Sequence, residues 1–544
     1  MKTISRLLCA IVISFLSTPA YSQVSGISSS NLPLIVINTK GNTIIDASKI
    51  PATMKIIYNG VGQANRPTDV GNIYSGDIGI EIRGTYSATL PQKPYGFETR
   101  GLNGANLNVS LLGMPAENDW ILLANYNDKT FMRNSLAYEL SRKMGHYAAR
   151  TRLVEVIIEN YYKNYEGVYL LMEKIKQDKG RVNIAKLTNL DISGDDVTGG
   201  YIFKIDYFNQ SNSWQSNYRP IDHPEKAVYY VFHDPDVNEL FWLQEEYLKT
   251  AVNSFESVLY GSNFRDSEKG YPAWIDVNSF IDYFIINEVA RNVDGFKKSV
   301  YFFKDKDSKG GKINAGPVWD FDWAWKNIWD CSTFQATDGS GWSHRINDCL
   351  STPPYSNGWI IRLLQDENFA NALNKRYFEL RKSYLSFEYL NSYIDSVQNL
   401  VNEAQVRHYT KWPILSSNVG APEVDFRPTT YAGEVNKFKN WIKTRLTWLD
   451  GHMLGQSITG VDKFETAFSY RIFPNPAKDV VYLESSSEII SLDIFNSNGE
   501  CILTKTGISA FSTKLDVSGF SPGIYVVHLK TNGNQIINSK LVIR

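Results

Sequence analysis

The spacing of hydrophobic and polar positions changes twice along this chain of 544 residues. Strands are predicted where buried or alternating apolar runs occur, at 32–38, 53–58, 76–84, 153–159 and 167–175. One helix interrupts them, with apolar residues at Leu136, Leu140 and Met144. From Asp236 the spacing becomes helical, with helices predicted to end at Gly261 and near Val289 and others at 369–401 and 435–454. A strand-rich half followed by a helix-rich half predicts an α+β domain at 30–455.

The last part of the chain differs from what precedes it. Residues 456–469 are linker-like, and short predicted strands follow at 480–484, 489–495, 501–505, 512–516, 524–529 and 539–543. Gly-containing turns separate several of them. This pattern predicts a small all-β immunoglobulin-like sandwich at 470–544.

The stretch Arg291–Lys326 combines acidic residues with a predicted strand hairpin. Asp294 lies in a Gly-containing turn, an aromatic strand follows, and after a Gly-Gly turn the chain reaches Asp320 and Asp322. In protein kinases one Asp orients the acceptor hydroxyl, a polar residue five positions later helps to hold a metal ion, and a second Asp binds Mg²⁺. Here these places fall on Asp294, Ser299 and Asp320, with Asp322 close by. Asp and Gly are also common turn residues, so turn and strand-end roles fit the spacing equally well.

The first 22 residues have the features of a secretory signal peptide. Lys2 and Arg6 precede the apolar run 7–16, which is too short to span a bilayer, and small residues lead to a cleavage site near Gln23. No later apolar run is long enough to span a membrane. The formal net charge of -1 provides no general attraction to nucleic acid.

The cysteines allow two interpretations. Cys331 and Cys349 bracket a Gly/Ser/Asp-rich loop, so in an exported protein they form either a disulfide or a pair of free thiols. If they pair, Cys501 is left over. There is no C-x-x-C, no H-E-x-x-H and no His pair at helical spacing, so His223 and His233 are predicted to be loop or core residues, not metal ligands.

The central stretch resembles the signature of the spore-coat CotH family of atypical kinases. Members carry an N-x-D-G turn, an S-x-Y-x-F strand and a P-x-W-D-[FY]-D end, which match residues 292–295, 299–303 and 317–322. Further similarity lies at 83–93, at D-x-T-x-x-R-N (128–134) and at G-V-Y-L-L-M-E-K-I (167–175). The resemblance implies a kinase-like two-lobed domain that holds ATP and Mg²⁺ between its lobes.

The resemblance also implies roles for residues outside that stretch. Lys93 is the candidate for the lysine that reaches the phosphates, and Glu173 is its candidate partner. Because the chain has no G-x-G-x-x-G loop and no Walker A sequence, Arg83 is assigned to the phosphates and Trp319 to the nucleotide. Considered alone, Lys93 is a solvated loop charge and Glu173 pairs with a cross-strand neighbour. The 128–134 element is equally explained as a helix N-terminal cap.

The C-terminal module resembles the sorting domain of type IX secretion cargo. The similarity rests on F-P-N-P (473–476), N-S-N-G (496–499), G-I-Y (523–525) and the closing K-L-V-I-R. It implies the secretion machinery as a partner and export to the outside or the outer surface of a Bacteroidetes-type cell. The alternative is an accessory sandwich that binds a partner or a glycan.

Together these features predict a secreted or cell-surface atypical kinase that transfers the γ-phosphate of ATP to Ser or Thr of an exported protein or of itself. ATP is scarce outside the cell, so the main rival is a catalytically silent scaffold that binds carbohydrate or protein. Aromatic residues, 13% of the chain, fit that rival or a stacked core. A second rival is a hydrolase that uses Asp294 and Asp320 as paired carboxylates.

Overall fold

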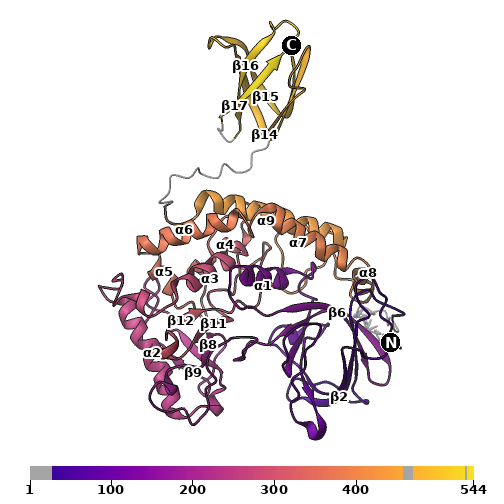
Figure 1. Ribbon diagram of the computed structural model, residues 1–544, viewed down its shortest axis with the longest axis vertical. Helices are drawn as coiled ribbons and strands as arrows, with labels where there is room; N and C mark the ends of the chain where they lie inside the picture. The colour runs from indigo at the N-terminus through magenta and orange to yellow at the C-terminus, as the bar shows by residue number, and fades with distance from the viewer. Residues whose placement is uncertain (1–26, 457–469, 533–535) are drawn as a thin grey trace, which may run out of the picture. The chain divides into compact units, whose positions relative to one another are not determined.

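The structure is a computed structural model that describes residues 27–456, 470–532 and 536–544 (Figure 1). The chain forms two compact units, Met1–Ile458 and Thr459–Arg544. The signal peptide expected at 1–22 and nearly all of the linker expected at 456–469 lie outside the described residues. Among the helices of the described ranges, none is both long and apolar enough to cross a membrane.

Seven strands of the first unit close into a barrel. They are β1 (Leu34–Asn38), β2 (Ile50–Ile57), β3 (Tyr74–Ile82), β4 (Tyr95–Arg100), β5 (Asp119–Ala124), β6 (Thr151–Glu159) and β7 (Lys163–Glu173). The order is β1-β2-β3-β4-β5-β7-β6, and the parallel pairing of β1 with β6 closes it. Side chains alternate across each strand. Every second residue therefore enters one buried core, as Ile80, Phe97, Trp120 and Tyr169 do.

This barrel corrects part of the expected fold. The first unit is α+β, but the kinase-like two-lobed architecture is only loosely supported, because a closed barrel is not a kinase-like small lobe. The apolar pattern predicted β1, β2, β3, β6 and β7. It missed β4, which follows the 83–93 element, and β5. Closure depends on which strands meet, and alternation within a strand carries no information about that.

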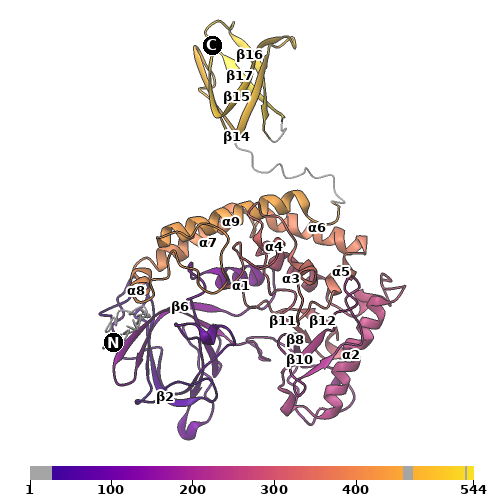
Figure 2. The same cartoon turned by 180° about the vertical axis from the view of Figure 1, so that it is seen from behind.

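The rest of the first unit combines a small sheet with helices. The sheet runs β12 (Ile313–Ala315), β11 (Val300–Lys304), β8 (Tyr201–Ile205), β10 (Tyr229–Asp234), β9 (Ser213–Gln215). The helices are α1 (Arg133–Lys143), α2 (Trp242–Tyr260), α3 (Val277–Val289), α4 (Ser332–Gln335), α5 (Trp359–Leu363), α6 (Glu367–Arg381), α7 (Phe387–Leu400), α8 (Ala404–Lys411) and α9 (Tyr431–His452). Both views show α6, α7 and α9 lying along one side of this unit, with the barrel strands and the β8–β12 sheet on the other side (Figures 1 and 2).

Helix α3 is the central support of this half. All but its first two residues are buried, its N-terminus is capped by Asp276, and it contacts α1, α6, α9 and β12. A helix that is buried on all its faces is a core helix. The segment that follows it, which begins at Arg291, is therefore anchored in the interior of the unit.

The second unit is all-β. Its strands are β13 (Tyr470–Phe473), β14 (Val480–Phe495), β15 (Cys501–Asp516), β16 (Gly523–Thr531) and β17 (Ile536–Ile543). The order is β13-β14-β16-β17, with β15 on β14. Two pairs of short predicted strands are here single long strands, and β14 stays paired with β15 across register shifts. Bulges of this kind let one strand continue through an irregular apolar pattern.

Candidate functional site

A cleft of about 520 Å³ gathers most of the predicted site residues within the first unit. It is lined by the segment after β3, the end of β5, helix α1, strand β8 and the segments 294–301, 319–323 and 350–354. Of the residues predicted from sequence, it contains Arg83, Asp294, Ser299, Trp319, Asp320 and Asp322. The volume is in the usual range for small-molecule sites.

Two carboxylates lie together in this cleft. Burial and the neighbouring Asp322 carboxylate raise the pKa of Asp320 well above its usual range, while the Lys298 ammonium opposes the shift. Ser299 Oγ lies 3.4 Å from Asp320 Oδ2. Asp320 (φ 67°) and Ser299 (φ 55°) are both in the left-handed region, at a cost of roughly 1 kcal/mol or more each. In these conformations the Ser299 hydroxyl and the Asp320 carboxylate are neighbours in the cleft.

Several polar contacts orient the acidic segment. Asn134 Oδ1 on α1 accepts the backbone N–H of Phe321 at 2.8 Å, and the Asp320 N–H lies 3.3 Å from the Tyr138 hydroxyl. From the end of the barrel, Asn127 Nδ2 donates to Asp322 Oδ2 at 2.6 Å. The segment is thus fixed from both halves of the unit.

Asp294 lies in a tight turn directly after α3. Its carboxylate is 2.9 Å from Lys298 Nζ and 3.7 Å from Lys297 Nζ. Burial lowers the pKa of Lys298, but Asp294 and Asp320 raise it by more, so the net shift is upward and the amine stays charged. Gly295 is required because a Cβ there would lie 2.1 Å from Asn287 Oδ1. The turn therefore presents Asp294 through close packing against α3.

Cations and aromatic rings form the remaining walls. Lys204 Nζ on β8 is 2.8 Å from Asp206 Oδ2 and 5.5 Å from the centroid of the Tyr301 ring. Burial opposes its charge, but Tyr301 and Asp206 raise the pKa of Lys204 overall. Trp319 stacks on Tyr138 with ring centroids 5.9 Å apart. The cleft therefore offers an ammonium group and aromatic surface beside two hard carboxylate oxygen donors.

Residues 80–449 match the family described as "CotH kinase protein". The chain belongs to this family. The match begins inside β3, so β1 and β2 precede the matched range although they complete the same closed barrel. Residues 471–544 match the secretion system C-terminal sorting domain, and this domain supports a secreted or cell-surface location.

No curated protein matches the chain. Among solved structures, a DUF3244 family protein with an immunoglobulin-like β-sandwich fold from Bacteroides vulgatus ATCC 8482 is similar at 9% identity, over 14% of this chain and 91% of that chain, with a TM-score of 0.12. CopC from Methylosinus trichosporium OB3b is similar at 16% identity, over 13% of this chain and 78% of that chain, with a TM-score of 0.11.

The predicted pairing of Lys93 with Glu173 is wrong. Lys93 Nζ donates to the carbonyl of Ala88 at 2.8 Å, and Lys93 is not among the residues that line the cleft. Glu173, fully buried at the end of β7, instead accepts from the Arg150 guanidinium at 2.8 Å, from the Arg150 N–H and from the Tyr147 hydroxyl. The alternative interpretation, in which Glu173 pairs with a neighbour across the sheet, agrees better with these contacts. A buried carboxylate needs hydrogen-bond donors, and Arg150 and Tyr147 supply them.

Two kinds of site residue were missed from the sequence. Lys204 lies on β8 and Asp206 follows directly after it, but neither carries a spacing that relates it to Asp320. Asn127 precedes the CotH-family element at 128–134, which was explained as a possible helix cap. Asp128 does accept the N–H of Arg133, at 2.8 Å, so capping describes part of that element. Its other part is Asn134, which holds the acidic segment.

The cysteine prediction is confirmed in its paired form, with Cys501 free and exposed. The disulfide joins the segment that follows Asp322 to Cys349, and the next residues, 350–354, line the cleft. Lys226 Nζ also holds this wall by donating to the carbonyl of Leu350 at 2.8 Å.

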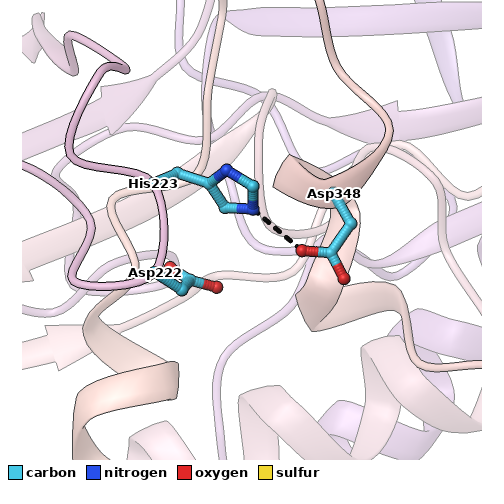
Figure 3. A group of neighbouring side chains, drawn as sticks. All are labelled: Asp222, His223 and Asp348. Atoms are coloured by element: carbon cyan, nitrogen blue, oxygen red, sulfur yellow. Dashed lines mark hydrogen bonds and ion pairs between the residues drawn. The ribbon is translucent and has the colours of Figure 1, made fainter.

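A cluster of two aspartates and a histidine lies near this wall (Figure 3). Asp222, His223 and Asp348 have ligand atoms within 4.8 Å of one another, and His223 Nε2 is 2.8 Å from Asp348 Oδ1. Arg345 already binds both oxygens of Asp348. Burial lowers the pKa of His223, but the Asp348 and Glu225 carboxylates outweigh burial and raise it overall. The group is an ion-pair network that supports the 350–354 wall.

Proposed function

We propose that this chain is a secreted or cell-surface atypical kinase that transfers the γ-phosphate of ATP to a Ser or Thr hydroxyl of an exported protein or of itself. The observation that carries the proposal is the meeting of Asp294, Ser299, Asp320 and Asp322 in one cleft with cations on its walls. Membership of the CotH kinase family also supports this proposal.

The residues of the cleft fit the groups that this reaction needs. Carboxylate and hydroxyl oxygens are the donors that Mg²⁺ prefers, and Asp320, Asp322 and Ser299 supply them. Burial and the neighbouring Asp322 carboxylate raise the pKa of Asp320, and a bound divalent cation would oppose both effects. When bound, Mg²⁺ would neutralise the phosphates and help to orient them.

Asp294 would orient the acceptor. Its carboxylate would accept the proton of the incoming hydroxyl as the new phosphorus–oxygen bond forms and the bond to the ADP oxygen breaks. Lys298 Nζ lies 2.9 Å from that carboxylate. Lys204 and Arg83 would face the phosphates, and Trp319 and neighbouring rings would contact the nucleotide.

The test is calorimetry of the full chain with ATP and Mg²⁺, together with transfer of radiolabelled γ-phosphate. Asp320→Ala should lose metal-dependent ATP binding. Asp294→Ala should retain binding and transfer phosphate at least about 10²-fold more slowly, because positioning and proton removal are lost. Asp307→Ala is the control, since Asp307 is 61% exposed and lies between β11 and β12 of the same hairpin.

Equal transfer by the parent and both cleft variants would reject the proposal. Absence of ATP binding in every protein, including the parent, would also reject it and favour the scaffold interpretation, in which the CotH domain binds a partner without chemistry.

A further inference from the structure

A second cavity, of about 470 Å³, lies along α9 and is lined by none of the residues that line the acidic cleft. Helix α9 forms its floor with two adjacent rows of residues at helical spacing. One row is Gly433, Lys437 and Trp441, and the other is Asn436, Asn440 and Thr444. Residues 425–428 and 337–339 form its sides.

Aromatic surface is available in this cavity. Phe426 is 81% exposed on one side, which is unusual for a large apolar side chain beside a cavity. Trp441 on the floor is held rigidly, because its Nε1 donates to Asn327 Oδ1 at 2.6 Å and the Arg291 guanidinium lies 5.5 Å from its ring centroid. A ligand would meet one fixed ring and one exposed ring.

The lysine of the cavity has an ion-pair partner, and the carboxylate of the cavity is hydrogen-bonded to a neutral amide. Lys437 Nζ is bonded to Glu423, and Asp425 Oδ2 accepts from Asn327 at 2.6 Å. An anionic ligand would find no free counter-charge among these residues, because their one ammonium group is already paired with Glu423.

Neutral hydrogen-bonding groups remain available. Asn436 and Asn440 are exposed on successive turns of α9, and within the described part of the chain neither side chain has a hydrogen-bond partner. An amide both donates and accepts, so the pair suits a ligand whose hydroxyls do the same.

We infer that this cavity binds a neutral saccharide, with one sugar ring packed on Phe426 and its hydroxyls bonded by Asn436 and Asn440. A sugar ring has apolar C–H faces and a neutral hydroxyl edge, which match the aromatic surface and the free amides. The volume is in the range for a small-molecule ligand. The sorting domain supports a location where polysaccharide is met. This site goes beyond the proposed kinase activity and does not depend on it.

The test is affinity electrophoresis of the full chain in native gels that contain dextran, hydroxyethylcellulose, xyloglucan or galactomannan. At least one of these neutral polysaccharides should retard the protein. Phe426→Ala should weaken the binding about tenfold or more, as expected for a central aromatic contact, and Asn440→Ala should weaken it several-fold. Both side chains are exposed, so both variants should fold, and thermal melting checks this.

Two variants make the result specific. Trp242→Ala removes another exposed aromatic ring, 60% exposed at the start of α2, and should bind like the parent. Asp320→Ala should also bind like the parent, which separates this site from the kinase cleft. Retardation by none of the four polysaccharides would overturn the inference and leave a protein segment as the alternative occupant. Equal retardation of parent, Phe426→Ala and Asn440→Ala would overturn it too.

Discussion

The two halves of the first unit contribute to the cleft in different ways. The helix-rich half supplies Asp294, Ser299, Asp320 and Asp322 from one hairpin that follows the buried helix α3. The barrel supplies separate groups from its strand connections, among them Arg83 and Asn127. The difference teaches that the carboxylates and the hydroxyl of the cleft come from a short, strained segment, while the barrel supplies contacts that orient this segment. Changes in the barrel should therefore alter stability or affinity, and changes in the hairpin should abolish transfer.

The largest expected effect in the barrel is on stability. Glu173→Ala leaves the Arg150 N–H and guanidinium and the Tyr147 hydroxyl without their acceptor, and should lower the free energy of unfolding by about 3 kcal/mol. Urea unfolding measures this. Glu159→Ala is the control, because Glu159 pairs with the exposed Lys163 and should change stability by less than about 1 kcal/mol. A folded Glu173→Ala protein that has lost ATP affinity would restore the phosphate-site role first expected of Glu173.

The next comparison sets a lysine of the sheet beside the helices against a lysine of the barrel. Lys204→Met removes a cation from the cleft and leaves Asp206 unpaired, so ATP affinity should fall about 100-fold. Lys93→Met breaks only a contact to the Ala88 carbonyl and should change ATP affinity less than threefold. Calorimetry measures the ATP affinity of both variants. A larger loss of affinity in Lys93→Met than in Lys204→Met would support the phosphate-binding role first expected of Lys93.

A smaller effect is expected where the barrel touches the acidic segment. Asn127→Ala removes the amide that orients Asp322, and should weaken Mg²⁺ binding about tenfold while ATP affinity without metal is unchanged. Asn125→Ala is a matched control, since Asn125 is buried nearby and donates to the Val168 carbonyl outside the cleft. Similar loss of Mg²⁺ affinity in both variants would mean that the effect of Asn127 is general loosening of the loop.

The same contrast explains what could be predicted from the sequence. Asp294, Ser299, Asp320 and Asp322 were found because they lie within one hairpin, where spacing along the chain is close to distance in space. Lys204 was missed because β8 joins β11 through pairing over a long separation. The Lys93–Glu173 pair was wrong because it assumed a kinase-like small lobe, and only strand pairing reveals the closed barrel. The disulfide was predictable as an option, since two cysteines bracketed one loop.

The disulfide also determines at which stage the wall of the cleft acquires its final covalent structure. It ties the segment behind the acidic hairpin to Cys349, directly before the residues that form one wall of the cleft. Disulfides form in oxidising compartments and are rare in the cytosol. For a chain that carries a secretion sorting domain, the covalent clamp on that wall is therefore added after departure from the place of synthesis. The newly made protein and the exported protein therefore differ by one covalent bond beside the cleft. The structure of this wall depends on the compartment that the protein has reached.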